Sequence, residues 1–258
     1  MRMSKERVLT EGEFNRLLSV CDNSEYPYEN KFLIYGMGRL GLRCGEIAHI
    51  KDTWVNSLSG IIGIPDHDPC SCNYCLDKYL KRKKVETASP SEVSKVQWQP
   101  KTKHGMRAIP YDFDPEIFDV VNHIMGKYGK NPISYAQIRH RIDYFSRSAR
   151  IPDLSPHGLR ATAATFFARD GITAGTLTEI MGWGDITVAN HYVLMNGMDI
   201  RREIDRVYGK NKKVDFNKRI EYKLTDIGEK IILNQVTSHD MRRLKRFLEH
   251  YDVIPHKF

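Results

Sequence analysis

The chain has 258 residues, the length of one large domain or of one domain with a small appendage. Its 41% hydrophobic and 10% aromatic residues suffice for a packed core and exclude a wholly disordered protein. A net charge of +8 favours an anionic partner such as nucleic acid. No run approaches the roughly 20 apolar residues of a membrane span, and the polar start lacks the apolar segment of a signal peptide. We therefore expect a cytoplasmic protein with no membrane partner.

The first part of the chain alternates short helices with short strands. Thr10 and Glu13 have the spacing of a capping box, which predicts the start of the first helix. Polar residues 81–94 are expected to form a flexible loop, and residues 96–111 a β-hairpin that turns at His104-Gly105. The other elements expected here are helices over about residues 30–38 and 44–50 and strands over 54–55 and 60–64.

From Pro115 onward the pattern is helical. Apolar residues recur at helical spacing, and Gly171 and Gly182 follow two of the expected helices as stop signals. The expected helices begin near Pro115 and include residues 138–149, 155–170, 173–181 and 187–193.

Three separated pieces of the sequence carry cations and hydrogen-bond donors that suit a phosphodiester. An arginine begins a helix in Gly41–Glu46, two lysines lie in Lys101–Lys103, and the third piece combines His157–Arg160 with Gly182–Tyr192. His157 and Arg160 are three residues apart, so one helical face presents both. Arginine offers a planar fork of donors that matches phosphate oxygens.

The order and spacing of these motifs resemble the tyrosine recombinase (phage integrase) family. The matching motifs are G-L-R-x-x-E at Gly41–Glu46, K-T-K…R-x-I-P at Lys101–Pro110, H-x-L-R at His157–Arg160 and the G-[H/W]…Y box at Gly182–Tyr192. The resemblance extends roughly from Thr10 to Tyr208. It implies a mainly α fold with a small antiparallel three-stranded sheet. It also implies an enzyme that cleaves and rejoins DNA through a covalent 3′-phosphotyrosyl link, with no cofactor for catalysis.

The resemblance assigns a role to each residue of these motifs. Tyr192 is the expected nucleophile, although a phenol with a pKa of about 10 needs activation near neutral pH. Arg43 and Arg160 would bind the non-bridging phosphate oxygens and neutralise the charge of the transition state.

The remaining roles concern proton transfer and positioning. Lys101 would protonate the departing 5′ oxygen as general acid, and Lys103, two residues away, remains an alternative. His157 would act in proton transfer and phosphate bonding. Trp183 would donate its indole N–H to the phosphate and pack against the helix of the nucleophile. Glu46 is expected to orient a nearby donor.

A separate cluster of sulfur and nitrogen ligands lies at His67, Cys70, Cys72 and Cys75, in the pattern H-x2-C-x-C-x2-C. Zinc prefers tetrahedral nitrogen and sulfur sites, and a Cys3His set would be a closed, structural one. We therefore expect a compact zinc knuckle within residues 65–77, which resembles an insertion in some archaeal integrases. The alternative is a reduced surface loop with free thiols.

The expected domains are a catalytic domain over residues 1–208 and a basic extension over residues 209–258, which holds 12 Lys/Arg against 7 Asp/Glu. Residues 219–228 resemble the start of a winged helix, and residues 241–251 form an amphipathic pattern that could pack in trans on a second subunit or on its own domain. Most relatives carry a core-binding domain before the first catalytic arginine. Since Arg43 comes early, the chain is either a reduced recombinase or a piece of a longer protein.

The function predicted is that of a site-specific integrase of a mobile element, such as a virus or provirus, in the nucleoid or on host DNA. Its expected partners are double-stranded DNA and copies of itself in a tetramer. Two alternatives stay open: a topoisomerase IB-like enzyme that nicks and closes DNA, and a DNA-binding regulator that has lost catalysis.

Overall fold

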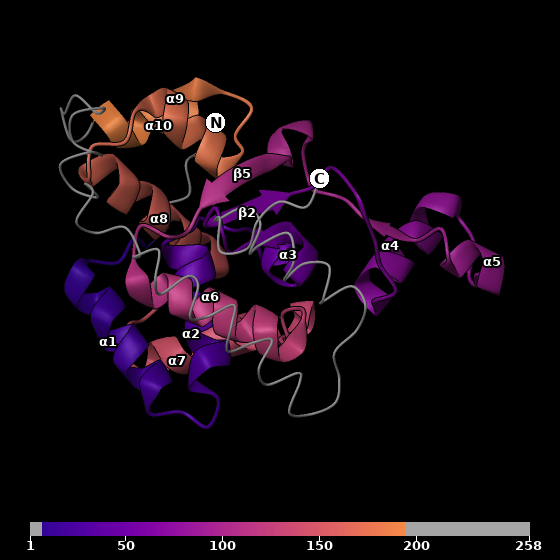
Figure 1. Cartoon of the computed structure of the whole chain (residues 1–258), viewed down its shortest axis with the longest axis horizontal. Helices are drawn as coiled ribbons and strands as arrows, with labels where there is room; N and C mark the ends of the chain where they lie inside the picture. Colours follow the sequence, from indigo (N-terminus) through magenta and orange to yellow (C-terminus); the bar gives the residue numbers. More distant parts are fainter. Residues whose placement is uncertain (1–6, 195–258) are drawn as a thin grey trace, which may run out of the picture. The chain divides into compact units, whose positions relative to one another are not determined.

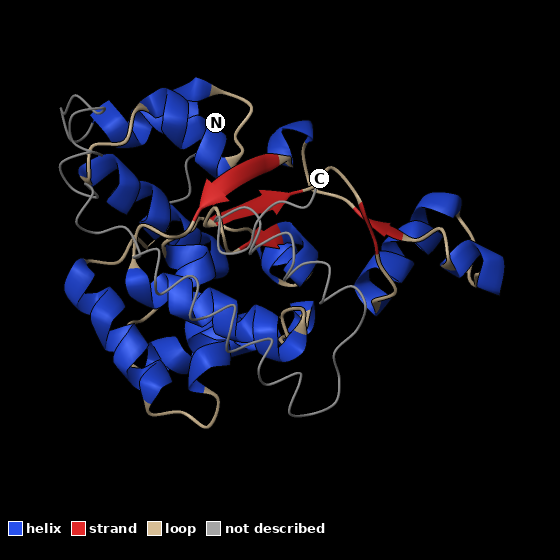
Figure 2. Ribbon diagram, in the orientation of Figure 1, coloured by secondary structure: helices blue, strands red, loops and turns tan. Residues whose placement is uncertain are grey.

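The computed structural model describes residues 7–194, in which short strands lie among helices (Figures 1 and 2). The helices are α1 (Glu11–Asp22), α2 (Pro27–Gly38), α3 (Cys44–Ile47), α4 (Asn73–Lys83), α5 (Pro90–Val93), α6 (Pro115–Tyr128), α7 (Tyr135–Ser148), α8 (Pro156–Arg169), α9 (Ala174–Met181) and α10 (Ile186–Leu194), with 3-10 turns η1 (Asp52–Trp54) and η2 (Lys103–Gly105). The strands are β1 (Val55–Asn56), β2 (Ile61–Ile64), β3 (Asp68–Pro69), β4 (Gln97–Trp98) and β5 (Arg107–Pro110). No helix in residues 7–194 is long and apolar enough to cross a membrane.

The predicted three-stranded antiparallel sheet is confirmed, with strand order β1-β2-β5. Ile62 in the central strand pairs with Val55 on one side and Ile109 on the other. The predicted hairpin over residues 96–111 is wrong, because its two arms belong to different sheets. β5 pairs with β2, whereas β4 pairs with β3 in a separate two-stranded sheet. The alternation of apolar residues marked both strands but could not identify their partners.

Helix α2 is the centre of the helical core and packs against α1, α6 and α8. It is buried on nearly all sides, as expected of a helix surrounded by others. The capping box of Thr10 and Glu13 starts α1 as predicted, and Phe14 of this helix meets Phe166 of α8 edge to face at 5.7 Å between ring centres. The core thereby fixes α8, which carries two of the predicted site residues.

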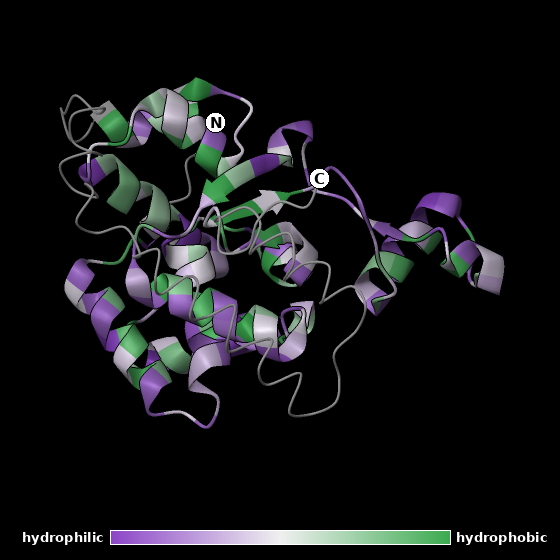
Figure 3. Cartoon of the chain, viewed as in Figure 1, coloured by the Kyte–Doolittle hydropathy of each residue, from purple (hydrophilic) through white to green (hydrophobic). Residues whose placement is uncertain are grey.

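Residues 68–98, from β3 through α4 and α5 to β4, form a segment that we call the arm. Figure 1 shows α4 and α5 lying apart from the helices that surround the sheet. The predicted loop over residues 81–94 is wrong in part, since it contains the end of α4 and all of α5. Ser89 and Glu92 form a capping box that begins α5. The last turn of α4, Lys81–Lys83, is exposed and strongly hydrophilic (Figure 3).

The base of the arm is joined to the body by polar and aromatic contacts. Lys51 Nζ donates to Pro69 O at 2.8 Å and forms an ion pair with Asp68 at 2.7 Å. The rings of Trp54 and Trp98 lie 4.8 Å apart. The predicted extension over residues 209–258, with its winged-helix and amphipathic segments, lies outside the described residues, as does Tyr208.

Candidate active site

Arg43 is the N-cap residue of α3, and its side chain is held at both ends of its guanidinium. Glu46 accepts a hydrogen bond from Arg43 N at 2.8 Å and pairs with its Nη1 at 2.9 Å. Arg43 Nη2 donates to Gly182 O at 2.5 Å. The first predicted arginine is thus tied to the segment between α9 and α10, 139 residues further along the chain.

Arg160 approaches the same place from α8 and is almost fully buried. Its Nε donates to Gly41 O at 2.8 Å, and its Nη2 donates to Met181 O. Burial, reinforced by the nearby Arg43 guanidinium, lowers the pKa of Arg160 to about 9. The side chain is therefore cationic at neutral pH in a setting where a phosphate would be a favourable partner.

Arg107 is a third arginine of this centre, and the sequence prediction did not include it. It is buried on β5 and forms two hydrogen bonds of 2.7 Å to the carboxylate of Glu46, and its Nε donates to Ile180 O at 2.7 Å. Burial by itself would raise the pKa of Glu46, but the bonds from Arg107 and the surrounding guanidinium charges lower it to about 2. The sequence did carry a sign that Arg107 is buried: residues alternate between the two faces of a strand, and Arg107 shares its face with the apolar Ile109.

Trp183 and Tyr192 stack on each other, with ring centres 5.5 Å apart and an angle of 15° between the rings. Both pack against the apolar cluster that joins α8, α9 and α10. Tyr192 is close enough to Arg160 to affect its pKa electrostatically. Gly182, which precedes Trp183, has a φ of 58°, and a Cβ atom there would lie 3.1 Å from Arg43 Nη1. A glycine at this position thus permits close approach of the backbone to Arg43.

The three remaining predicted residues are exposed. His157 lies in the first turn of α8, one helical turn before Arg160, where the Ser155 hydroxyl caps the helix. Lys101 precedes η2 and Lys103 begins it. η2 itself lies against the Gly182–Gly184 segment, since a Cβ on Gly184 would come within 3.0 Å of His104 Nε2. The structure thus gathers the arginines, the indole and the phenol, and leaves the lysines and His157 on the surface.

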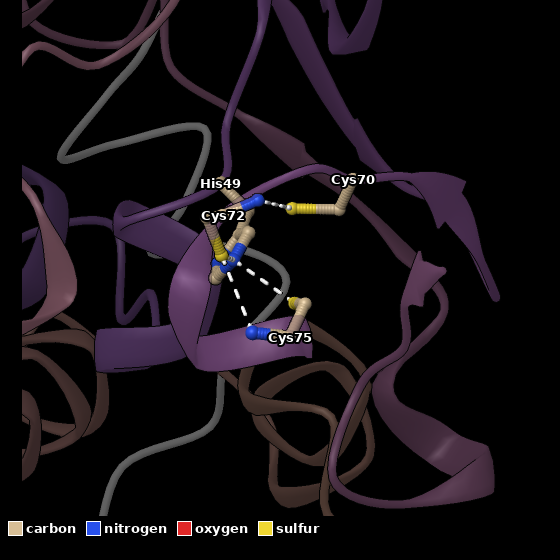
Figure 4. A group of neighbouring side chains, drawn as sticks. All are labelled: His49, Cys70, Cys72 and Cys75. Atoms are coloured by element: carbon tan, nitrogen blue, oxygen red, sulfur yellow. Dashed lines mark hydrogen bonds between the residues drawn. The ribbon is translucent and has the colours of Figure 1, made fainter. Parts of the chain in front are cut away.

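Three of the five cysteines form a second group of side chains. The prediction that His67 belongs to this group was wrong. Cys70, Cys72 and Cys75 lie together with His49, and their four ligand atoms are within 4.8 Å of one another (Figure 4). His67 is exposed and pairs with Asp66 instead.

His49 follows α3 in the chain and is far from the cysteines in sequence, so local spacing gave no sign of it. Its Nε2 lies 3.2 Å from Cys72 Sγ and 3.3 Å from Cys75 Sγ. All five cysteines are free, and burial raises the pKa of the Cys70 and Cys75 thiols and lowers that of His49. A group of three thiols and one neutral imidazole could hold a metal ion.

The fold is that of the catalytic domains of tyrosine recombinases. The sequence matches the phage integrase family over residues 7–197, and the chain therefore belongs to this family. Comparison with curated protein sequences finds no match. The predicted family, fold and activity are thereby confirmed: the protein is a site-specific tyrosine recombinase.

Solved structures of tyrosine recombinases share the fold. The integrase of the Tn1549 transposon, in complex with transposon right end DNA, matches 80% of this chain and 67% of its own, with a TM-score of 0.57 and 16% identity. The XerA recombinase matches 83% of this chain and 67% of its own, with a TM-score of 0.51 and 15% identity.

Proposed function

We propose that Tyr192 is the nucleophile that attacks a DNA phosphorus atom and that Arg43 and Arg160 bind its non-bridging oxygens. The Tyr192 oxygen forms the new bond to phosphorus while the bond to the 5′ oxygen breaks, which leaves a 3′-phosphotyrosyl link and a 5′ hydroxyl. A 5′ hydroxyl from another strand can reverse the step, so no external energy source is needed. The observation that carries this assignment is that both arginines donate to the backbone carbonyls just before Trp183, whose ring stacks on Tyr192, and that Tyr192 is close enough to Arg160 to affect its pKa.

The leaving oxygen needs a proton, and we assign it to Lys101, with Lys103 as the competing choice. Both lysines are exposed on the segment that lies against Gly182–Gly184, on a surface that a DNA strand can reach. His157, one turn before Arg160, would bond to the phosphate and take part in proton transfer as the acceptor of the phenol proton that Tyr192 loses. Trp183 would donate its indole N–H to the phosphate and orient Tyr192 through stacking.

We further propose that residues 1–208 form the catalytic domain, that residues 209–258 are a basic extension, and that four copies assemble on double-stranded DNA in the nucleoid or on host DNA. The net charge of +8 and the DNA in the complex of the related Tn1549 integrase support a DNA partner. The sulfur-rich group supports a structural zinc ion, whereas the catalytic steps above use only side chains of the protein.

A suicide substrate tests the nucleophile directly. This DNA carries the attachment site with a nick beside the cleavage position, so the short fragment released by cleavage diffuses away and the covalent complex accumulates. We expect the wild-type protein to form this complex and Tyr192→Phe to form none, because the variant lacks only the attacking oxygen. Tyr144→Phe is the matched control, since Tyr144 is 64% exposed on α7, and it should react like wild type. A covalent complex with Tyr192→Phe, measured on denaturing gels, would contradict the assignment.

A further inference from the structure

We propose that His49, Cys70, Cys72 and Cys75 bind one zinc ion, and that this ion fastens the arm to the chain segment that carries Arg43 and Glu46. The site joins two parts of the sequence: the three cysteines come from the start of the arm, and the histidine follows α3 (Figure 4). The metal site stands independently of the proposed catalytic roles. Only its consequence for catalysis rests on them.

The spacing of the four ligand atoms suits a tetrahedral ion. Zinc–sulfur and zinc–nitrogen bonds of about 2.3 and 2.0 Å place the ligand atoms of such a site roughly 3.5–3.8 Å apart. His49 Nε2 lies 3.2 Å from Cys72 Sγ and 3.3 Å from Cys75 Sγ, and no two ligand atoms are more than 4.8 Å apart. Small side-chain rotations therefore suffice to surround one ion.

The hydrogen bond of the His49 ring orients it for metal binding. Gly45 O accepts from Nδ1 at 2.6 Å, which makes Nδ1 the protonated nitrogen and leaves the Nε2 lone pair for the metal. Gly45 lies in α3 between Arg43 and Glu46. Thus the ligand that closes the site is itself bonded to the helix that begins at the catalytic arginine.

Two ligands of the site are buried and the other two, Cys70 and Cys72, are half-buried. His49 is 7% exposed and Cys75 4% exposed, and Trp98 of β4 stacks on the His49 ring at 5.8 Å. Four protein ligands leave no open position for substrate or water, as in structural zinc sites.

A metal ion would stabilise the position of the arm, because the sheet at the base of the arm is short. β3 and β4 are strands of only two residues each. Cys72 is the N-cap of α4 and Cys75 lies in its first turn, so a bound ion would fix the start of the helix whose exposed last turn is basic. β4, at the other end of the arm, leads directly to Lys101. The ion would thereby set the position of the arm relative to Arg43.

Zinc content of the purified full-length protein tests the ligand set. Purification under reducing conditions without chelator should give about one zinc per chain for wild type and for His67→Ala, and less than a tenth of that for His49→Ala and Cys72→Ser. Circular dichroism establishes that the variants fold. If a variant is unfolded, the wild-type protein is titrated with cobalt instead. The cobalt-loaded protein should show the absorption of a tetrahedral site with thiolate ligands. Zinc-free wild type, or zinc lost with His67→Ala and retained with His49→Ala, would overturn the proposal.

Hydrogen exchange tests the anchoring role. Removal of zinc by a chelator should raise deuterium uptake severalfold in residues 70–98 and leave α8 unchanged; equal uptake in the arm would refute the anchoring. Tyr192→Phe should keep its zinc. A zinc-loaded wild-type protein that forms no covalent DNA complex would thus contradict the proposed catalytic roles and leave the metal site intact.

Discussion

Glu46 is the residue on which the arrangement of the arginines depends. Its carboxylate, 1% exposed, accepts two hydrogen bonds from Arg107 and one from the side chain of Arg43, and it offsets part of the repulsion between Arg43 and Arg160. Holding two guanidiniums close together costs electrostatic free energy, and a neighbouring anion reduces that cost. Glu46 supplies that anion before DNA is bound.

Replacing Glu46 with Gln should therefore destabilise the fold by about 3 kcal/mol or more, because it leaves buried guanidiniums without a counterion. The folded-state pKa of Glu46, about 2, lies below its ordinary value of 4.5. Its stabilisation is complete above pH 4.5 and is lost as the pH falls toward 2, so the variant should lack this part of the acid sensitivity.

Urea unfolding at pH 7 and at several values between pH 5 and 2.5 measures both effects. Glu86→Gln, which alters an exposed carboxylate of the arm, is the control and should unfold like wild type. An unchanged unfolding free energy for Glu46→Gln at pH 7 would show that the arginines do not need this carboxylate.

At this scale the sequence identified most residues of the proposed catalytic centre, and it missed Arg107 of that centre and His49 of the separate cysteine group. The motif order marked Arg43, Arg160 and Tyr192, because their chemistry and spacing were both informative. The sequence did not reveal the role of Arg107, because that role depends on its hydrogen bonds to Glu46, which lies 61 positions away in the chain. His49 meets its cysteines only after the arm folds back, which no local spacing could reveal.

At the scale of elements, the segment from β4 to β5 matters most for the proposed chemistry, because it carries both candidate lysines: Lys101 before η2 and Lys103 at its start. The strand pattern on either side was read correctly, but β4 and β5 were paired with each other. The structure instead pairs each with an earlier strand. Pairing between strands distant in sequence depends on the whole fold, whereas the capping boxes at Thr10 and Ser89 act locally.

Lys101→Ala should slow cleavage by about 100-fold or more on ordinary DNA, the usual contribution of a general acid. On a substrate with sulfur in place of the 5′ bridging oxygen, the variant should recover most of the wild-type rate, since a thiolate leaves without a proton. Lys103→Ala, the matched control, should react normally on both substrates. Quenched-flow cleavage assays give the six rates, for wild type and both variants on each substrate, and the reverse pattern would move the role to Lys103.

At the scale of the whole molecule, we propose that the basic extension, residues 209–258, contributes to assembly on DNA. It adds five net positive charges to the chain. A chain truncated after Tyr208 should keep covalent cleavage of the suicide substrate, because every proposed catalytic side chain precedes that position. It should form smaller complexes on DNA and bind more weakly, with a shallower dependence on salt.

Size-exclusion chromatography with light scattering on attachment-site DNA measures the complexes, and titrations at several salt concentrations measure the binding. The full-length chain carrying Tyr192→Phe is the control for assembly without cleavage. If the truncated chain forms the same complexes as the full-length one, the extension has no part in joining subunits.

The two backbone carbonyls that hold Arg160 belong to Gly41 and Met181, on segments that the fold alone brings together. In the proposed catalytic role, the side chain of Arg160 would bind phosphate and at the same time join two segments of the fold. Its plane is set before any nucleic acid arrives, so little reorientation opposes the chemical step. A substitution of Arg160 should therefore affect both the reaction and the stability of the fold.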